Sequence, residues 1–372
     1  MNNNQAGSVS AALTSLIGAA IADNGGWLPF DRFMSMALYQ PGLGYYASGR
    51  RTFGLLPQSG SDFVTAPELS PHFGRALARQ AAQALAATGS AEIVEFGAGS
   101  GALAAQLIDE LDALGVALQR YSIVDLSASL RERQQALLGR FGDRVRWLDE
   151  LPAAIDGLVV GNEVLDAMPV QLLHFDGERW FERGVASGEG GFAWADRPTD
   201  LRPPLAQQWI AGSTVEIHRQ AEAFVTTAVE RMRRCVAILV DYGFPQAEYY
   251  HPQRHQGTVM CHQAHLVDAD PLVDVGAKDI TAHVDFTAIA LAAQDAGAEV
   301  IGYTSQARFL FNCGLAELLQ AADPRERAHA QKLVNEHEMG ELFKVIAFAK
   351  GCQRPFLDDP LGFRQGDRSH TL

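Results

Sequence analysis

Residues 95–103 read EFGAGSGAL, a short glycine-rich turn between two regular segments. An apolar run, AEIV at 91–94, precedes the turn, and a segment with helical spacing, 102–111, follows it. A strand that passes through such a turn into a helix is the first unit of an open α/β sheet, and its glycines let a nucleotide-like cofactor approach the backbone. The sequence therefore predicts a cofactor site at this turn.

The spacing of the glycines leaves the kind of cofactor open. The turn supplies Gly97, Gly99 and Gly101. The dinucleotide fingerprint G-x-G-x-x-G has its third glycine at position 102, which is alanine here, and alanine is tolerated there. An NAD-dependent oxidoreductase is therefore one alternative, although the sequence offers no convincing hydride-directing histidine or Tyr-Lys pair elsewhere.

The acidic residue before the turn favours a different cofactor. Glu95 stands two residues before Gly97, where a carboxylate repels a pyrophosphate but suits a cationic amino or sulfonium group. The pattern E-x-G-x-G-x-G is typical of methyltransferases that use S-adenosylmethionine (SAM). Asp125, at the end of the next expected strand, can accept hydrogen bonds from both ribose hydroxyls, which suits either cofactor.

Short apolar runs alternate with helical segments after residue 91. Strands are expected at 92–96, 121–125, 145–148, 157–161 and 236–241. Helices are expected at 102–114, 127–138 and 221–234. Repeated strand–helix units predict an α/β protein with an open, doubly wound and mostly parallel sheet. The basic run RMRR (231–234) ends a helix, where cations are favoured, so it is interpreted as structural.

The segments around this core have other patterns. Residues 1–90 are expected to form a helical extension, with a loop at 41–75 that closes over the cofactor. The core, 91–352, carries an antiparallel insert at about 170–200 and a His-, Gly- and Asp-rich insert at about 244–285. Late strands at 257–261, 299–304 and 343–349 are expected to complete the sheet. Residues 353–372 are expected to be a flexible tail.

Composition narrows the protein class. The 372 residues are 47% hydrophobic and 20% charged, which is ordinary for a globular protein, and the net charge of −14 argues against nucleic-acid binding. Four widely spaced cysteines indicate reduced thiols. No apolar run approaches the roughly 20 residues of a membrane span, and the N-terminus resembles neither a signal nor a transit peptide, so a cytoplasmic location is expected.

Six motifs together resemble a known family. They are ALYQPGLGYY (37–46), SDFVTAPELSPHFG (61–74), EFGAGSGAL, GNEVLDAMPVQ (161–171), LVDYG (239–243) and DPLVDVGAKDITAHVDFT (270–287). In this order they resemble the MidA-like methyltransferases, whose mitochondrial members are protein-arginine methyltransferases needed to assemble respiratory complex I. The resemblance implies the Rossmann-like fold of SAM-dependent methyltransferases with inserted segments. It also implies SAM as cofactor, S-adenosylhomocysteine as product, and a protein substrate such as a respiratory-complex subunit. One departure is Ser61, where the family usually has glycine.

The candidate catalytic residues are carboxylates. A guanidinium has a pKa above 12, so an enzyme that methylates it must hold and orient it, and carboxylates match its fork. Glu163 is the first candidate because it directly follows the strand at 157–161. Glu68, in the covering loop, is the second. Asp166 is the third but equally suits a turn cap, and Asp241 ends a strand near the substrate side or forms a turn.

The candidate cofactor contacts surround the glycine turn. They are Glu95, Gly97, Ala98, Gly99, Gly101, Asp125, Leu126, Asp149, Asn162, Thr65 and Pro67. Asp149 follows the third strand, where adenine is often contacted, and a helix cap before Pro152 is its alternative. The segment at 162–165, NEVL, is not N-P-P-Y, the tetrapeptide that marks methylation of adenine or glutamine amide nitrogens.

The sequence also allows other interpretations of its histidine-rich segment and of its function. His255, Cys261, His262 and His265 cluster in the sequence, but they lack ordered ligand spacing, and no metal is predicted. A nearby DITAHVDFT segment is expected to brace the insert against the core through its histidine and second aspartate, at positions 283 and 285. Alternatives for function are methylation of another nitrogen, oxygen or small molecule, and a SAM-binding assembly factor with little turnover.

Overall fold

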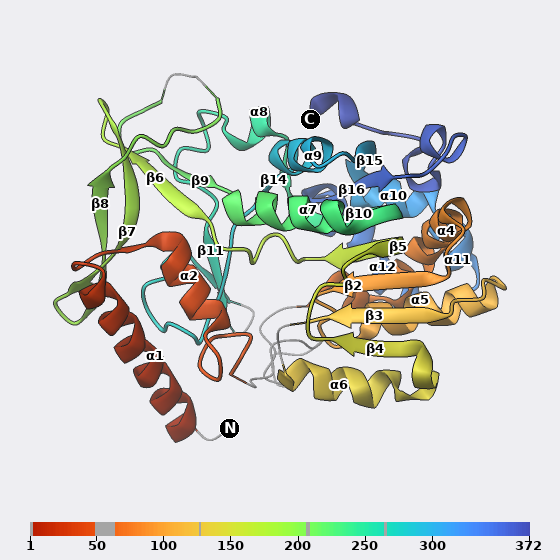
Figure 1. The fold of residues 1–372 in the computed structure, drawn as a ribbon, viewed down its shortest axis with the longest axis horizontal. Coiled ribbons are helices and arrows are strands. Elements are labelled where there is room, and N and C mark those ends of the chain that lie inside the picture. The colour runs from red at the N-terminus through yellow and green to blue at the C-terminus, as the bar shows by residue number, and fades with distance from the viewer. Residues whose placement is uncertain (1–2, 49–63, 126–127, 206–208, 264–265) are drawn as a thin grey trace.

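The computed structural model describes residues 3–48, 64–125, 128–205, 209–263 and 266–372 (Figure 1). Its central sheet runs in the order β4-β3-β2-β5-β10-β16-β15, and a short strand, β14, joins the end of β10. The strands are β2 (Glu92–Phe96), β3 (Arg120–Val124), β4 (Val145–Leu148), β5 (Ile155–Asn162), β10 (Met232–Phe244), β14 (Val284–Asp285), β15 (Glu299–Ser305) and β16 (Phe343–Lys350).

The sheet is doubly wound, as the sequence predicts. All its pairs are parallel except those of β16, which lies antiparallel between β10 and β15. From β2 the chain proceeds outward to β3 and β4, and then returns to place β5 on the other side of β2. The strand order therefore reverses between β2 and β5, and this is the point where open α/β sheets bind ligands.

Helices cover both faces of the central sheet, which explains why its inner strands are almost wholly apolar. One face packs against α4 (Pro71–Thr88) and α5 (Ala102–Ala113), and the other against α7 (Arg219–Arg231) and α9 (Phe286–Asp295). Ser70 caps α4 by accepting a hydrogen bond from the backbone N–H of His72, as expected for a Ser-Pro pair. The other α-helices of the described chain are α1 (Asn3–Asp23), α2 (Phe30–Tyr39), α3 (Ala66–Leu69), α6 (Ala128–Leu138), α8 (Gln246–Tyr249), α10 (Gln306–Asn312), α11 (Leu315–Gln320) and α12 (Pro324–Val334).

The basic run at 231–234 crosses a helix–strand boundary. The predicted helix 221–234 ends at Arg231, and β10 begins at Met232. Arg233 and Arg234 both form ion pairs with Asp156, which lies on the neighbouring strand β5. The run therefore joins two strands of the sheet, in agreement with a structural role.

A second, antiparallel sheet lies beside the first (Figure 1). It contains β1 (Leu28–Pro29), β6 (Gln171–Phe175), β7 (Trp180–Gly188), β8 (Gly191–Pro198) and β9 (Thr214–Ile217). This confirms antiparallel strands in the insert at 170–200. Helices α1 and α2 pack against this sheet through buried side chains that include Phe30 and Phe33.

A third sheet corrects one prediction. The run at 257–261 was expected to complete the central sheet, but β11 (Met260–Gln263) pairs antiparallel with β12 (Leu266–Asp268) and β13 (Asp279–Thr281). The central sheet has no room for it, because β16 pairs with β10 along eight residue positions and β5 occupies the other edge of β10.

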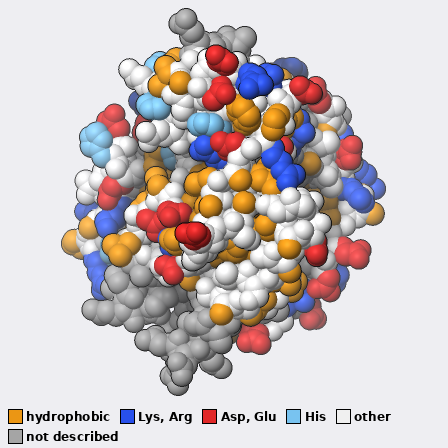
Figure 2. Space-filling view, turned by 90° about the vertical axis from the view of Figure 1, so that its left-hand side faces the viewer, with side chains coloured by type: hydrophobic (Ala, Val, Ile, Leu, Met, Phe, Trp, Pro, Cys, Tyr) orange, Lys and Arg blue, Asp and Glu red, His pale blue; other side chains and the backbone are white. Residues whose placement is uncertain are grey.

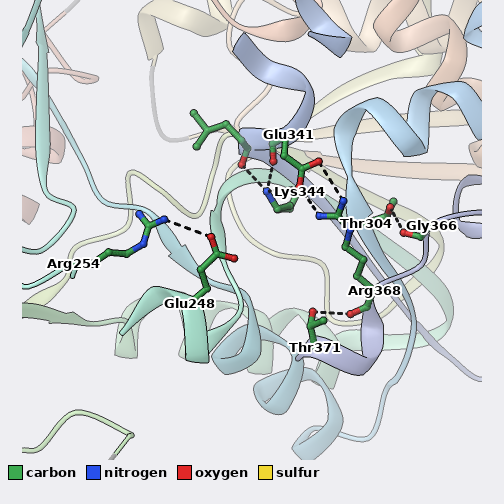
Figure 3. Close-up of polar contacts among 9 residues, drawn as sticks. Glu248, Arg254, Thr304, Glu341, Lys344, Gly366, Arg368 and Thr371 are labelled. Carbon is green, nitrogen blue, oxygen red and sulfur yellow. Dashed lines mark hydrogen bonds and ion pairs between the residues drawn. The ribbon is translucent and has the colours of Figure 1, made fainter. Parts of the chain in front are cut away.

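The expected flexible tail is instead packed against the core. Phe356 and Phe363 are 7% and 4% exposed and lie in the larger core cluster. Figure 3 shows the polar contacts of the same segment: Thr304 Oγ1 donates to the Gly366 carbonyl at 2.6 Å, and Arg368 pairs with Glu341 at 2.5 Å. Sequence polarity did not reveal the tail's packing because its two anchoring phenylalanines stand among charged residues.

The described surface is polar and mixed. Within the described ranges, every helix is too short or too polar to cross a bilayer. On the face in Figure 2, hydrophobic side chains lie across the middle of the molecule with acidic side chains beside them.

Candidate functional site

A cavity of about 920 Å³ opens at the carboxyl ends of β2, β3, β5 and β10. The strand ends and the glycine turn form one wall, and α2, α3 and the strands β11–β13 contribute the others. The cavity therefore lies at the reversal of strand order, where the sequence predicts it.

The glycine turn has a backbone that requires glycine at its first position. Gly97 has φ of 61°, and a Cβ placed there would stand 3.1 Å from Val164 Cγ2. Its N–H donates to the Val124 carbonyl at 3.1 Å, which fixes the end of β2 against β3. A substituted side chain would both strain the backbone and fill space at the cavity wall.

Glu95 lies in the cavity wall and is 2% exposed. Tyr121 Oη donates to its Oε2 at 2.8 Å. Burial raises the pKa of Glu95 to about 8, and the nearby charge of Asp125 adds to this rise against the lowering effect of Tyr121. Such a carboxylate gains most from a cationic ligand, because a positive charge beside it offsets the cost of burying its negative charge.

Asp125 also lines the cavity and is held by a residue that the sequence reasoning missed. Gln134, on α6, is fully buried and donates from Nε2 to Asp125 Oδ2 at 2.8 Å and to the Gly99 carbonyl at 3.0 Å. Its own Oε1 accepts from Trp147 Nε1 at 2.8 Å. One amide therefore positions both the glycine turn and the acidic end of β3, a role that a lone glutamine in a helix does not signal in a sequence.

Asn162 supplies an acceptor suited to a ligand. Its Nδ2 donates to Glu163 Oε1 at 2.8 Å, whereas its buried Oδ1 has no hydrogen-bond partner among the described residues. Buried polar atoms are normally satisfied, so an acceptor in the cavity wall fits the amino or hydroxyl groups of a nucleoside-type cofactor. With Gly97, Glu95 and Asp125, it makes a wall that fits SAM.

Glu163 occupies an unusual backbone conformation at the end of β5. Its φ is 55°, and its N–H donates to the Val240 carbonyl at 2.8 Å. The carboxylate accepts a hydrogen bond from the Ala66 N–H, and burial with the nearby Asp166 raises its pKa to about 8. A non-glycine residue held in the left-handed region is often a functional one, and here the strain turns the carboxylate into the cavity.

Asp166 lies in the same wall and accepts a hydrogen bond from Tyr242, while burial raises its pKa to about 6. Asp241 is fully buried behind it and accepts from the N–H groups of Leu165 and Asp166, at 2.8 and 3.3 Å. Asp241 therefore fixes the loop that carries Glu163 and Asp166, which accounts for its position at a strand end.

Glu68 lies on the glycine-turn side of the cavity. Its Oε1 accepts a hydrogen bond from Ser100 Oγ. Thr65 and Pro67 line the cavity nearby, and the Pro67 carbonyl accepts from Gln106 Nε2 at 2.8 Å. The covering loop is thus tied to the turn and to α5 where it is described. Part of this loop, residues 49–63 with Ser61, is outside the described residues.

Two predicted cofactor contacts lie away from the cavity lining. The Asp149 side chain is 84% exposed and pairs with Arg131 at 2.7 Å, because it points from the end of β4 toward α6 and solvent. Gly101 caps α5 behind the turn, where a Cβ would meet Leu138. Ala98 and Gly99 line the cavity as expected. Leu126 lies outside the described residues.

The side of the cavity near α2 and β13 contains residues to which the sequence reasoning assigned no role. Tyr46 Oη donates to Asp279 Oδ2 at 2.8 Å, and both line the cavity. Tyr39 Oη donates to the Ala167 carbonyl at 2.7 Å. The six motifs contain Tyr39, Tyr46 and Asp279. Only the folded structure shows that Tyr46 and Asp279, 233 positions apart in the sequence, are in contact. Other lining residues that had no expected role include Ser35, Leu151, Phe224, Tyr242, His262 and Thr281.

The histidine-rich segment has mixed roles. His283 lines the cavity and stacks edge-on against Tyr242, with ring centroids 5.2 Å apart, and burial lowers its pKa to about 4. Asp285 caps α9 by accepting from Thr287 and Ala288, as a bracing residue would. Cys261 is fully buried in β11. His265 is outside the described residues.

Comparison with known proteins gives the cofactor chemistry. Residues 76–304 match the family model of S-adenosyl-L-methionine-dependent methyltransferases. A crystal structure from Burkholderia thailandensis, bound to S-adenosyl-homocysteine, is 49% identical, covers 100% of this chain and 99% of its own, and has a TM-score of 0.95. A second, native structure from that organism is 48% identical, with a TM-score of 0.91 and coverage of 100% and 99%.

Curated relatives extend the comparison and correct one prediction. A zebrafish (Danio rerio) protein arginine methyltransferase NDUFAF7 is 27% identical, covering 87% of this chain and 84% of its own. The human (Homo sapiens) protein of that name is 26% identical, covering 85% and 78%. Both are named as mitochondrial proteins, which contradicts the cytoplasmic location expected from the N-terminal sequence.

Proposed function

The chain belongs to the family of S-adenosyl-L-methionine-dependent methyltransferases, and on this premise we propose that it methylates an arginine nitrogen of a protein substrate. The curated relatives, which are named protein arginine methyltransferases, support the acceptor class. The observation that carries the proposal is the pair of carboxylates, Glu163 and Asp166, in the cavity wall.

The charge of the cavity suits two cationic partners. The described lining residues include no lysine or arginine. They include six carboxylates, which are Glu68, Glu95, Asp125, Glu163, Asp166 and Asp279. SAM supplies a methyl group activated by a sulfonium charge when it is bound. The guanidinium of an arginine brings a second positive charge to the same space.

We divide the cavity into two sides by the elements that carry the carboxylates. Glu95 and Asp125 stand with the glycine turn, and Glu68 is bonded to that turn through Ser100. These three residues are proposed to hold the cofactor, and Glu68 is thereby moved from the catalytic candidates to the cofactor side because of its hydrogen bond with Ser100. Glu163 and Asp166 stand on the loop after β5, where they are proposed to hold the acceptor.

Glu163 can both orient a guanidinium and take up a proton. Its raised pKa reflects burial without a cation, so an approaching guanidinium stabilises the charged form and makes the carboxylate an acceptor for the guanidinium N–H groups. Methylation leaves a nitrogen with a proton to lose, and the Glu163 carboxylate beside it is placed to receive that proton.

A labelling experiment tests the proposal. Cell extract is incubated with the purified protein and methyl-labelled SAM, and the labelled peptides are sequenced. Label on arginine supports the proposal, and respiratory-complex subunits are the first proteins to examine, given the motif resemblance. Label confined to lysine, nucleic acid or small molecules would overturn it, as would binding of SAM without any transfer.

A further inference from the structure

The rim of the cavity carries an exposed apolar strand. On β12, Leu266 and Val267 are 74% and 59% exposed, the two highest values among the large hydrophobic side chains of the described residues. Successive side chains of a strand point to opposite faces, so these two expose one apolar side chain on each face of the sheet, and a molecule lying along the strand would cover both.

The strand is continuous with the cavity. Val267 lines the cavity together with His262, its register partner on β11. On the other side of β11, Asp279 and Thr281 of β13 also line it. The three-stranded sheet is therefore a wall of the cavity, and β12 is the outer strand of that wall.

The outer edge of β12 is open to pairing. In the described chain β12 pairs only with β11, so its other edge has no neighbouring strand. Native proteins protect edge strands with short length, charged residues, proline or a bulge. β12 has three residues and ends in Asp268, but it carries no lysine, proline or bulge. An extended polypeptide can add to such an edge through backbone hydrogen bonds.

We propose that β12 docks the segment of the protein substrate that flanks the methylated residue, as an added strand covering Leu266. The inference rests on the proposed function, because a target side chain that enters the cavity beside Val267 brings its neighbouring residues alongside β12. The exposed apolar side chains give this segment affinity, and the carboxylates of the cavity select a basic target residue.

The test compares a long and a short acceptor. The long one is a synthetic peptide of about eleven residues with a central arginine between alternating valine and threonine, which extends about 3.3 Å per residue. The short one is acetyl-arginine methylamide. Peptide binding is measured by fluorescence anisotropy with S-adenosylhomocysteine present, and methyl transfer to both acceptors is measured separately.

Leu266→Ser should weaken binding of the long peptide about ten-fold and raise its KM equally, because the variant loses the apolar contact between the leucine side chain and the peptide. Transfer to the short acceptor and the affinity for SAM should stay unchanged. Leu291→Ser is the matched control, since Leu291 is 50% exposed on α9 and outside the cavity lining, and it should change neither acceptor. Hydrogen exchange of the Leu266–Asp268 amides should slow when the long peptide binds.

The outcomes separate the two proposals. Binding that depends on Leu266 without methylation of the arginine contradicts the proposed acceptor and retains the docking strand. Methylation with the same KM in wild type and Leu266→Ser overturns the docking strand and retains the acceptor. A peptide-free dimer that dissociates in Leu266→Ser also overturns it, because a second copy would then be what covers β12.

Discussion

Tyr121 lies on the strand next to Glu95, one register pair away along the same face, and its phenol donates to the carboxylate at 2.8 Å inside the protein. The carboxylate that enters the cofactor turn is therefore supported from β3 but still carries a raised pKa of about 8. This pair gives the site a dependence on pH that can be measured without a protein substrate.

SAM should bind more tightly as pH rises from about 6 to about 8.5. Only the ionised Glu95 attracts a cationic ligand, and its pKa near 8 means that the ionised fraction grows through this range. Calorimetry at several pH values measures the effect. Glu95→Gln should bind SAM more weakly at pH 8.5 and show a flatter pH dependence, and an unchanged slope in this variant would assign the titration to another group.

The same group should make the ligand-free protein less stable at higher pH. The folded state holds the Glu95 proton with a pKa of about 8, against an ordinary value of 4.5, so it binds this proton more tightly than the unfolded chain does. The contribution of this proton to the free energy of unfolding is fully present below pH 4.5. It is lost as pH rises to 8, and the free energy of unfolding falls by at most about 1.4 kcal/mol per pH unit in this range. Denaturant unfolding of the wild type and Glu95→Gln at matched pH values isolates it.

Glu163→Gln should reduce kcat at least about a hundred-fold while changing SAM affinity little, because the amide keeps the shape of the side chain but neither pairs with a cation nor accepts a proton. Calorimetry and a labelled-methyl assay give the two quantities. Glu178→Gln, in an exposed turn, is the control for the loss of one carboxylate. Loss of SAM binding in Glu163→Gln would assign this residue to the cofactor side instead.

Gly97→Ala should weaken SAM binding more than it weakens folding. Both the positive φ and the 3.1 Å approach to Val164 oppose a side chain there. Gly115→Ala is a matched control, because Gly115 has φ of 73° but open space around its Cβ position and no place in the cavity. We expect each variant to lose about 1 kcal/mol or more of stability, and only the first to lose cofactor affinity.

Phe363→Ala should destabilise the protein by about 3–5 kcal/mol, since a buried aromatic side chain leaves a cavity when truncated. Thermal or denaturant unfolding checks this figure. A change below about 1 kcal/mol would mean that the C-terminal segment is held loosely in solution, as the sequence had indicated.

Local patterns predicted the parts of the fold that depend on neighbouring residues. The Ser70 cap, the apolar strand before Glu95 and the glycine turn all follow from short stretches whose physics is local. The meeting of Tyr46 with Asp279 could not be predicted in this way, because it depends on how distant inserts fold back over the strand ends. Asp149 lies outside the cavity lining for a related reason: its position at the end of β4 follows from the local pattern, while the direction of its side chain toward Arg131 depends on α6.

The hydrogen bond from Trp147 to Gln134 connects a fluorescent side chain to the cofactor wall of the cavity. Four of the five tryptophans stand at positions 27, 180, 194 and 209, in or beside the antiparallel sheet, so Trp147 is the sole indole of the central sheet. Its N–H is two hydrogen bonds from Asp125 and from the Gly99 carbonyl. A ligand that binds to Asp125 or to the Gly99 carbonyl changes the surroundings of this indole. Trp147 therefore serves as an intrinsic fluorescent reporter that needs no attached dye.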